Sequence, residues 1–208
     1  MSTPRYIADL HLGHRNIYKY RPVFKSTLHN DLFFLEVLRK VSTKRDTMYF
    51  LGDIIFDKEH LHAIRELPGT KILIPGNHCT EYVSMRELVS VFDDIHASLK
   101  KHGTWLTHIP IHDAELRGKP NVHGHVHAHS VPSVNHLNVS VDSMFMKYFP
   151  RTLDEVRKAL DWQQSTGEYF KGINNDDAKT IITNNPETRD IYFSTLEDSK
   201  KIKVILTK

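Results

Sequence analysis

The stretch Gly124-His125-Val126-His127 is the part of this chain whose residue types and spacing are best suited to chemistry. If the chain turns out of a strand here, the two imidazoles can diverge toward two neighbouring metal ions, for which histidine is a common ligand. Such ions need further ligands upstream. Short apolar runs are followed by residues that could serve, namely Asp9 with His11, Asp53, Asn77 and His108. The sequence therefore indicates a metal centre assembled from the ends of several strands.

The apolar runs that precede these residues are short and continuous, which is typical of buried strands. They cover residues 5–8, 47–51, 71–74 and 104–107. Between them, apolar residues at helical spacing predict an amphipathic helix over 27–41. Shorter helices are expected over 61–67, where Pro68-Gly69 ends the pattern, and from Thr80 as cap to about residue 89. Strands that alternate with helices indicate an α/β fold.

The second half of the chain predicts mostly strands. The apolar runs there cover residues 95–99, 104–107, 122–123 and 137–141, with a hairpin-like turn at 101–103. A helix over 153–162 is favoured because Thr152 and Glu155 have the spacing of a capping box. Residues 163–190 are polar and show no apolar period, so we expect a loop. Strands over 190–194 and 202–206 would then form a final hairpin.

Length and composition bound the class of protein. The 208 residues are enough for one α/β domain, and 39% hydrophobic with 25% charged residues can bury a sizeable core. The net charge of +3 is too small to indicate nucleic-acid binding by itself. One cysteine, Cys79, excludes an internal disulfide and a thiolate zinc cluster. Without a leader or an apolar run of about 18 residues, we expect a cytoplasmic protein with no membrane partner.

The order Asp-x-His, Gly-Asp, Gly-Asn-His, a lone His and Gly-His-x-His resembles the calcineurin-like metallophosphoesterase superfamily, over roughly residues 5–150. Residues 7–17, followed by Arg21-Pro22, are similar to a compact branch found in bacteria and their phages. The resemblance implies a four-layer αββα sandwich of two mixed sheets flanked by helices. We expect a core over residues 1–160 and a C-terminal extension over 161–208, the loop and hairpin, packed on the same domain.

The resemblance also implies how two divalent ions would be held. One would take Asp9, His11, Asp53 and His127, and the other Asp53, Asn77, His108 and His125. Asp53 would bridge them, because one carboxylate between two cations offsets their repulsion. A mixed nitrogen and oxygen donor set favours Mn²⁺, with Fe, Zn²⁺ or Ni²⁺ as alternatives, over Ca²⁺ and Mg²⁺.

The activity implied by the resemblance is hydrolysis of a phosphate ester by attack of a metal-bridging hydroxide. His78 would face the substrate and protonate the leaving alkoxide as general acid. Substrate contacts are expected from Asn77, His78, His14 and Arg15. The family usually carries an acidic residue after Gly-Asn-His to orient the histidine, whereas Cys79 stands here, so Glu81 and Asp113 are the candidates to replace it.

Several interpretations stay open at this level. A phosphodiesterase is favoured over a phosphomonoesterase or nucleotidase, with cyclic nucleotides, nucleotides and nucleic-acid ends as possible substrates. A non-catalytic metal-binding scaffold is a second hypothesis, and a single zinc site made of His123, His125 and His127 is a third. Some of these residues also have a purely structural alternative: Asp9 and Asp53 could cap turns, and His108 could be a buried core histidine. We expect structural or exposed positions for His123, His129 and His136. Weaker substrate roles are considered for His112 and Arg21.

Overall fold

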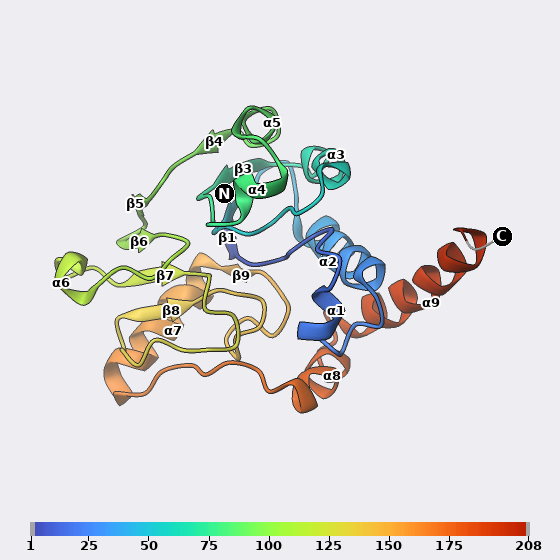
Figure 1. Ribbon diagram of the computed structural model, residues 1–208. Helices are drawn as coiled ribbons and strands as arrows, with labels where there is room; N and C mark the ends of the chain where they lie inside the picture. Colours follow the sequence, from blue (N-terminus) through green and yellow to red (C-terminus); the bar gives the residue numbers. More distant parts are fainter. Residues whose placement is uncertain (1–2, 207–208) are drawn as a thin grey trace.

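Two mixed β-sheets with flanking helices make up the computed structural model, which describes residues 3–206 and side chains as far as residue 201 (Figure 1). The first sheet has the order β4 (Asp94–Ile95), β3 (Thr70–Leu73), β2 (Thr47–Phe50), β1 (Pro4–Ile7) and β9 (Arg151–Thr152). The second has the order β5 (Leu99–Lys101), β6 (Thr104–Leu106), β7 (Asn121–His123) and β8 (His136–Asn138). Only β9 and β5 pair antiparallel within these sheets. The predicted α/β class is confirmed.

The two sheets meet where β1 ends. The backbone N–H of Ala8 donates to Val139 at 3.0 Å, and the N–H of Val141 donates to Ala8 at 3.2 Å. Side chains from both sheets share one apolar core, in which Ile7, Phe50, Leu106, Val122 and Leu137 are fully buried. Because the join lies directly before Asp9, it fixes the end of the first sheet against the end of the second.

The long helices follow the expected apolar patterns. Helix α2 (Thr27–Val41) begins at Ser26, which accepts a hydrogen bond from the N–H of His29. Helix α7 (Leu153–Thr166) begins with the predicted capping box between Thr152 and Glu155 and packs against β8, β9 and β1. The shorter helices are α1 (Ile17–Tyr20), the 3-10 helix η1 (Lys58–His60), α3 (Leu61–Arg65) and α6 (Asp113–Leu116).

The predicted helix from Thr80 to residue 89 is wrong. The segment forms two short helices, α4 (Cys79–Tyr82) and α5 (Met85–Val89), with Val83 extended between them. Ser84 begins α5 and forms a capping box with Glu87, so a local cap interrupts the apolar spacing that suggested one helix.

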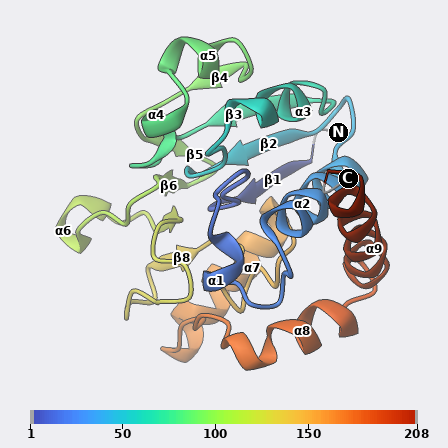
Figure 2. The same cartoon turned by 45° about the vertical axis from the view of Figure 1, so that its right-hand side comes forward.

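The C-terminal segment is helical, so the predicted loop over 163–190 and the hairpin over 190–206 are also wrong. Helix α8 (Asn175–Asn184) begins at Asn174, and α9 (Arg189–Leu206) lies along α2 (Figure 2). Tyr192, Thr195 and Ser199 are buried at helical spacing, so one face of α9 packs inward. Residues 190–194 and 202–206 resemble strands when each stretch is taken alone, because the helical period shows only over the longer segment. The division at residue 160 stays a prediction, and α7 runs through it.

Among the residues that the structure describes, no helix combines the length and the apolar character needed to cross a membrane.

His29 gives the fold an acid-sensitive link between α2 and α9. It is fully buried, and its Nε2 lies 3.2 Å from the carbonyl oxygen of Tyr192. Burial lowers the pKa of His29 from 6.5 to about 4. Between these pH values the unfolded chain binds more protons than the folded one. The stabilising contribution of neutral His29 is therefore complete above pH 6.5 and is lost as the pH falls.

We expect the free energy of unfolding to fall by ~2–3 kcal/mol by pH 4, and to fall less in His29→Gln. Urea unfolding followed by circular dichroism measures this free energy. An equal pH dependence of both proteins would contradict this role.

Candidate metal centre

The candidate ligands lie just past the carboxyl ends of parallel strands. Asp9 follows β1, Asp53 follows β2, Asn77 follows β3, His108 follows β6 and His125 follows β7. Strands β1 to β3 run parallel in one sheet and β6 to β8 in the other. Because carboxyl ends of parallel strands open at one edge, residues distant in sequence meet there.

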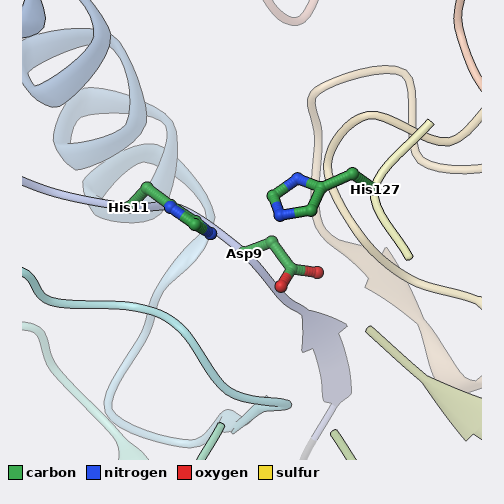
Figure 3. Close-up of side chains that lie close together, drawn as sticks. All are labelled: Asp9, His11 and His127. Atoms are coloured by element: carbon green, nitrogen blue, oxygen red, sulfur yellow. The ribbon is translucent and has the colours of Figure 1, made fainter. Parts of the chain in front are cut away.

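Asp9, His11 and His127 form the first group of possible metal ligands (Figure 3). One ligand atom from each lies within 4.8 Å of the others, and the two imidazole centroids are 4.8 Å apart. The Asp9 side chain is fully buried, and burial raises the pKa of its carboxyl. A divalent cation here would offset the cost of burying this carboxylate.

His11 provides the clearest test of whether a metal fits. Its Nε2 atom is buried and has no hydrogen-bond partner among the described residues. Burial and then the charge of Arg21 lower the pKa of His11 well below its usual value, so the ring is neutral. The ring also stacks on Phe56, with centroids 4.5 Å apart. A neutral imidazole with an orphaned nitrogen is what metal binding requires, so the residues present fit a metal ion.

Asp9 also belongs to a second group, with Asp53 and His108. The Nδ1–H of His108 donates to the carbonyl oxygen of Leu51 at 2.8 Å, which leaves Nε2 facing Asp53 Oδ2 at 3.3 Å. His108 is 3% exposed, yet both of its nitrogens face polar atoms at the centre, so it is more than a buried core residue. Asp9 belongs to both groups, whereas Asp53 belongs only to the second. The bridging role of Asp53 therefore stays a prediction.

Asn77 and His125 complete the cluster on the side of His108. The Oδ1 atom of Asn77 lies 3.0 Å from His108 Nε2 and 3.0 Å from His125 Nδ1. The backbone N–H of His125 donates to Asp9 Oδ2 at 3.0 Å. The structure thus brings together all seven residues that the sequence proposed as metal ligands, and their division between ions stays a prediction.

The backbone at most of these residues is left-handed. The φ angles are positive at Asp9 (60°), His11 (55°), Asp53 (51°), His125 (71°) and His127 (49°). Such conformations cost non-glycine residues roughly 1–2 kcal/mol each. The strain is concentrated where the side chains must turn inward together, as expected of a functional site.

Two glycines allow the carboxylates to approach the backbone. A Cβ on Gly76 would lie 2.2 Å from Asp53 Oδ1, and one on Gly124 would lie 2.7 Å from Asp9 Oδ2. Neither glycine has a positive φ, so space rather than backbone conformation requires them. This explains why glycine precedes Asn77 and His125 in the two motifs.

Sequence reasoning missed Asp142, which holds His127 in place. Its Oδ2 accepts a hydrogen bond from His127 Nδ1 at 2.8 Å, leaving the other ring nitrogen free for a metal. Arg21 donates to both oxygens of Asp142 at 2.8 Å and to the carbonyl oxygens of Asp9 and Leu10. Although burial opposes ionisation, Arg21 and His127 hold the pKa of Asp142 well below its usual range. Arg21 is 2% exposed and its guanidinium is occupied by these contacts, and its weaker substrate role stays a prediction.

Asp142→Asn is expected to weaken metal binding about 10–100-fold, because His127 loses its anionic partner. The affinity for Mn²⁺ can be measured by isothermal titration calorimetry on folded protein. Asp113→Asn is a matched control, since Asp113 forms a 2.6 Å pair with His136 away from the candidate ligands. Unchanged Mn²⁺ affinity in Asp142→Asn would show that Asp142 does not support a metal ligand.

His78 lies beside the centre with its ring directed by a neighbouring acid. Its backbone N–H donates to Asp53 Oδ1 at 3.1 Å, and its Nδ1 lies 2.9 Å from Glu81 Oε1. Of the two acids considered as replacements for the residue after Gly-Asn-His, Glu81 therefore contacts the histidine and Asp113 does not. With Nδ1 occupied, Nε2 is the nitrogen free to act on a substrate. Its role as general acid stays a prediction.

Cys79 supports the turn below Asp53 instead of orienting His78. Its sulfur accepts hydrogen bonds from the backbone N–H groups of Gly76 at 3.1 Å and Asp53 at 3.3 Å. Burial raises the pKa of the thiol, so it stays protonated. Cys79 therefore occupies the position of the motif's acidic residue but contacts the backbone of this turn, while Glu81 contacts His78.

The remaining histidines have structural roles or border the site. His112 caps α6 by accepting from the N–H of Ala114, so its weaker substrate role is not supported. His123 is fully buried against His136 and is absent from both ligand groups, so no single zinc site of His123, His125 and His127 forms among the described residues. His14 is half-buried beside His11, and Arg15 is exposed next to it.

Comparison with known proteins finds similar sequences and a similar structure. A protein of Methanocaldococcus jannaschii, MJ1445, is 28% identical over 169 residues, which is 74% of this chain and 89% of the relative. The gene 66 protein of Mycobacterium phage L5 is 35% identical over 83 residues, 38% of this chain and 40% of its own. The crystal structure of AQ665 from Aquifex aeolicus, a protein of unknown function, has a TM-score of 0.61 and 26% identity, and the match covers 76% of this chain and 99% of that one.

The family model of calcineurin-like phosphoesterases matches residues 6–206. This range includes every candidate ligand and also α8 and α9, which the sequence placed outside the family core. The chain therefore belongs to the calcineurin-like phosphoesterase family.

Proposed function

We propose that this protein is a metal-dependent phosphodiesterase with a dinuclear centre. The family membership and the two groups of possible ligands support metal-dependent phosphoesterase activity. The preference for a diester is supported by the surroundings of the centre. Two clefts meet at His14, one of about 660 Å³ and one of about 530 Å³. A diester carries an organic group on each side of the phosphate, whereas a monoester would fill only one cleft.

Each part of the site has a role in this proposal. Bound metal ions would supply a nucleophile at neutral pH and neutralise charge on the phosphoryl group. Asp9, His11, Asp53, Asn77, His108, His125 and His127 would hold them. Asn77 and His78 would orient the phosphate, with His14 and Arg15 at the mouth of the clefts. His78, held through Nδ1 by Glu81, would deliver a proton from Nε2 to the leaving oxygen.

The donor set favours Mn²⁺, with Fe, Zn²⁺ and Ni²⁺ as alternatives. Histidine nitrogen, carboxylate oxygen and one neutral amide suit borderline ions better than Ca²⁺ or Mg²⁺, which prefer oxygen alone. Loading the purified protein with each ion and measuring both metal content and turnover would rank them.

The deciding experiment compares p-nitrophenyl phosphate with bis(p-nitrophenyl) phosphate in the presence of Mn²⁺. We expect a higher kcat/KM on the diester. Equal or higher turnover of the monoester would favour the alternative, a phosphomonoesterase. Bound metal without turnover of either ester would favour the non-catalytic scaffold.

A further inference from the structure

The smaller of the two clefts is lined by aromatic and basic side chains. We call it the aromatic cleft, and it is lined by Gly13, His14, Arg15, Asn16, Phe56, Asp57, Lys58 and Tyr82. Its volume of about 530 Å³ lies within the range of small-molecule sites. None of its lining residues is a candidate metal ligand, so the cleft is distinct from the centre itself.

Phe56 connects the aromatic cleft to the centre. Its ring stacks on His11 with centroids 4.5 Å apart, and it lies 5.6 Å from the ring of His78 and 5.6 Å from that of Tyr82. The ring of Tyr82 is tilted by 32° relative to that of Phe56, so buried Phe56 supports the exposed Tyr82 at the wall of the cleft. A ligand group bound against these rings would be separated from His11 and His78 only by the ring of Phe56.

Tyr82 exposes its side chain at the wall of the aromatic cleft. It is 59% exposed at the end of α4, four residues after His78. An exposed aromatic ring is a surface on which a nucleobase can stack. Because α4 also carries Glu81, the helix that orients His78 also presents Tyr82 to the cleft.

Positive charge borders the same cleft. Arg15 and Lys58 are exposed, and neither forms an ion pair within the described part of the chain. The carboxylate of Asp57 also lines the cleft and accepts the N–H of Glu59 at 3.1 Å to begin η1, so the lining carries two cations and one anion. Aromatic rings beside unpaired cations match a base with neighbouring phosphate oxygens.

We propose that the aromatic cleft binds the nucleobase of a nucleoside phosphodiester whose scissile phosphate lies at the metal centre. The base stacks on the exposed ring of Tyr82, with buried Phe56 behind it, while Arg15 and Lys58 attract the oxygens of the phosphate. This inference rests on the proposed phosphodiesterase function and specifies its substrate class. A simple aliphatic diester would leave the ring of Tyr82 in water and gain nothing from it.

The test compares two diesters with the same leaving group, thymidine 5′-(p-nitrophenyl phosphate) and methyl p-nitrophenyl phosphate, in Mn²⁺. We expect kcat/KM to be about tenfold or more higher for the thymidine ester, mainly through a lower KM. Tyr82→Ala should remove most of this advantage, whereas Tyr82→Phe, which keeps the ring, should retain it. Tyr18→Ala is a control, because Tyr18 is exposed but lines neither cleft.

The outcomes separate this proposal from the function on which it rests. Hydrolysis of both esters at equal kcat/KM by the unchanged protein would overturn the nucleobase site and leave the phosphodiesterase standing. An advantage for the thymidine ester that survives Tyr82→Ala would also overturn the aromatic cleft as its source. Hydrolysis of neither ester by protein with bound metal would refute the phosphodiesterase itself.

Discussion

Replacing Asp53 by alanine is expected to remove both metal ions and reduce phosphodiester hydrolysis to the rate without protein. Asp53 is 2% exposed, and its two oxygens serve different partners. Oδ2 faces His108 Nε2 at 3.3 Å, and Oδ1 accepts the backbone N–H of His78 at 3.1 Å. The change therefore removes a proposed shared ligand and the contact that holds the proposed general acid to the centre.

The measurement is metal content per chain after loading with Mn²⁺ and desalting, together with turnover of bis(p-nitrophenyl) phosphate. Asp161→Ala, an exposed change on α7, should keep both properties. The structure makes the result informative, because Asp9 is common to both ligand groups. Retention of one ion by Asp53→Ala would assign the bridge to Asp9 instead.

His78→Ala is expected to leave metal content unchanged and to slow catalysis by ~10²–10⁴ for esters with poor leaving groups. His78 is not in either ligand group, but its ring is held by Glu81 at 2.9 Å. If its Nε2 protonates the leaving oxygen, the need for it falls as the leaving group becomes more acidic. The loss should therefore be much smaller for p-nitrophenyl than for phenyl or alkyl esters.

The comparison requires kcat/KM for a series of diesters that differ only in the leaving alcohol or phenol. Glu81→Gln should show the same trend with a smaller amplitude, because it weakens the contact that orients His78 without removing the ring. An equal loss across the series would instead identify His78 as an electrostatic binder of phosphate.

The sequence predicted the site more completely than the fold. Asp9, Asp53 and Asn77 each follow a short apolar run, and short runs between turns identify strand ends well. Because the carboxyl ends of parallel strands converge, knowing the ends was enough to place these side chains together. The turn at His102-Gly103 joins β5 to β6 as the sequence indicated, but the predicted strand over 95–99 is divided between β4 and β5, which lie in different sheets.

Two of the errors came from features that depend on partners distant in sequence. Asp142 is an isolated acid in the sequence, and only the fold places it against His127 and Arg21. The face of α9 was missed because Tyr192 and Thr195 derive their burial from packing against the core and α2. A local signal existed for α8, where Asn174 as cap precedes two aspartates in the first turn.

The left-handed backbone at five of the candidate ligands has a consequence for protein engineering. Glycine or asparagine at these positions would relieve conformational strain. Each such change would also remove a candidate metal ligand. Tolerance to heat and capacity for chemistry are therefore opposed at these same few residues, and a stabilised version of this enzyme must be sought elsewhere in the chain.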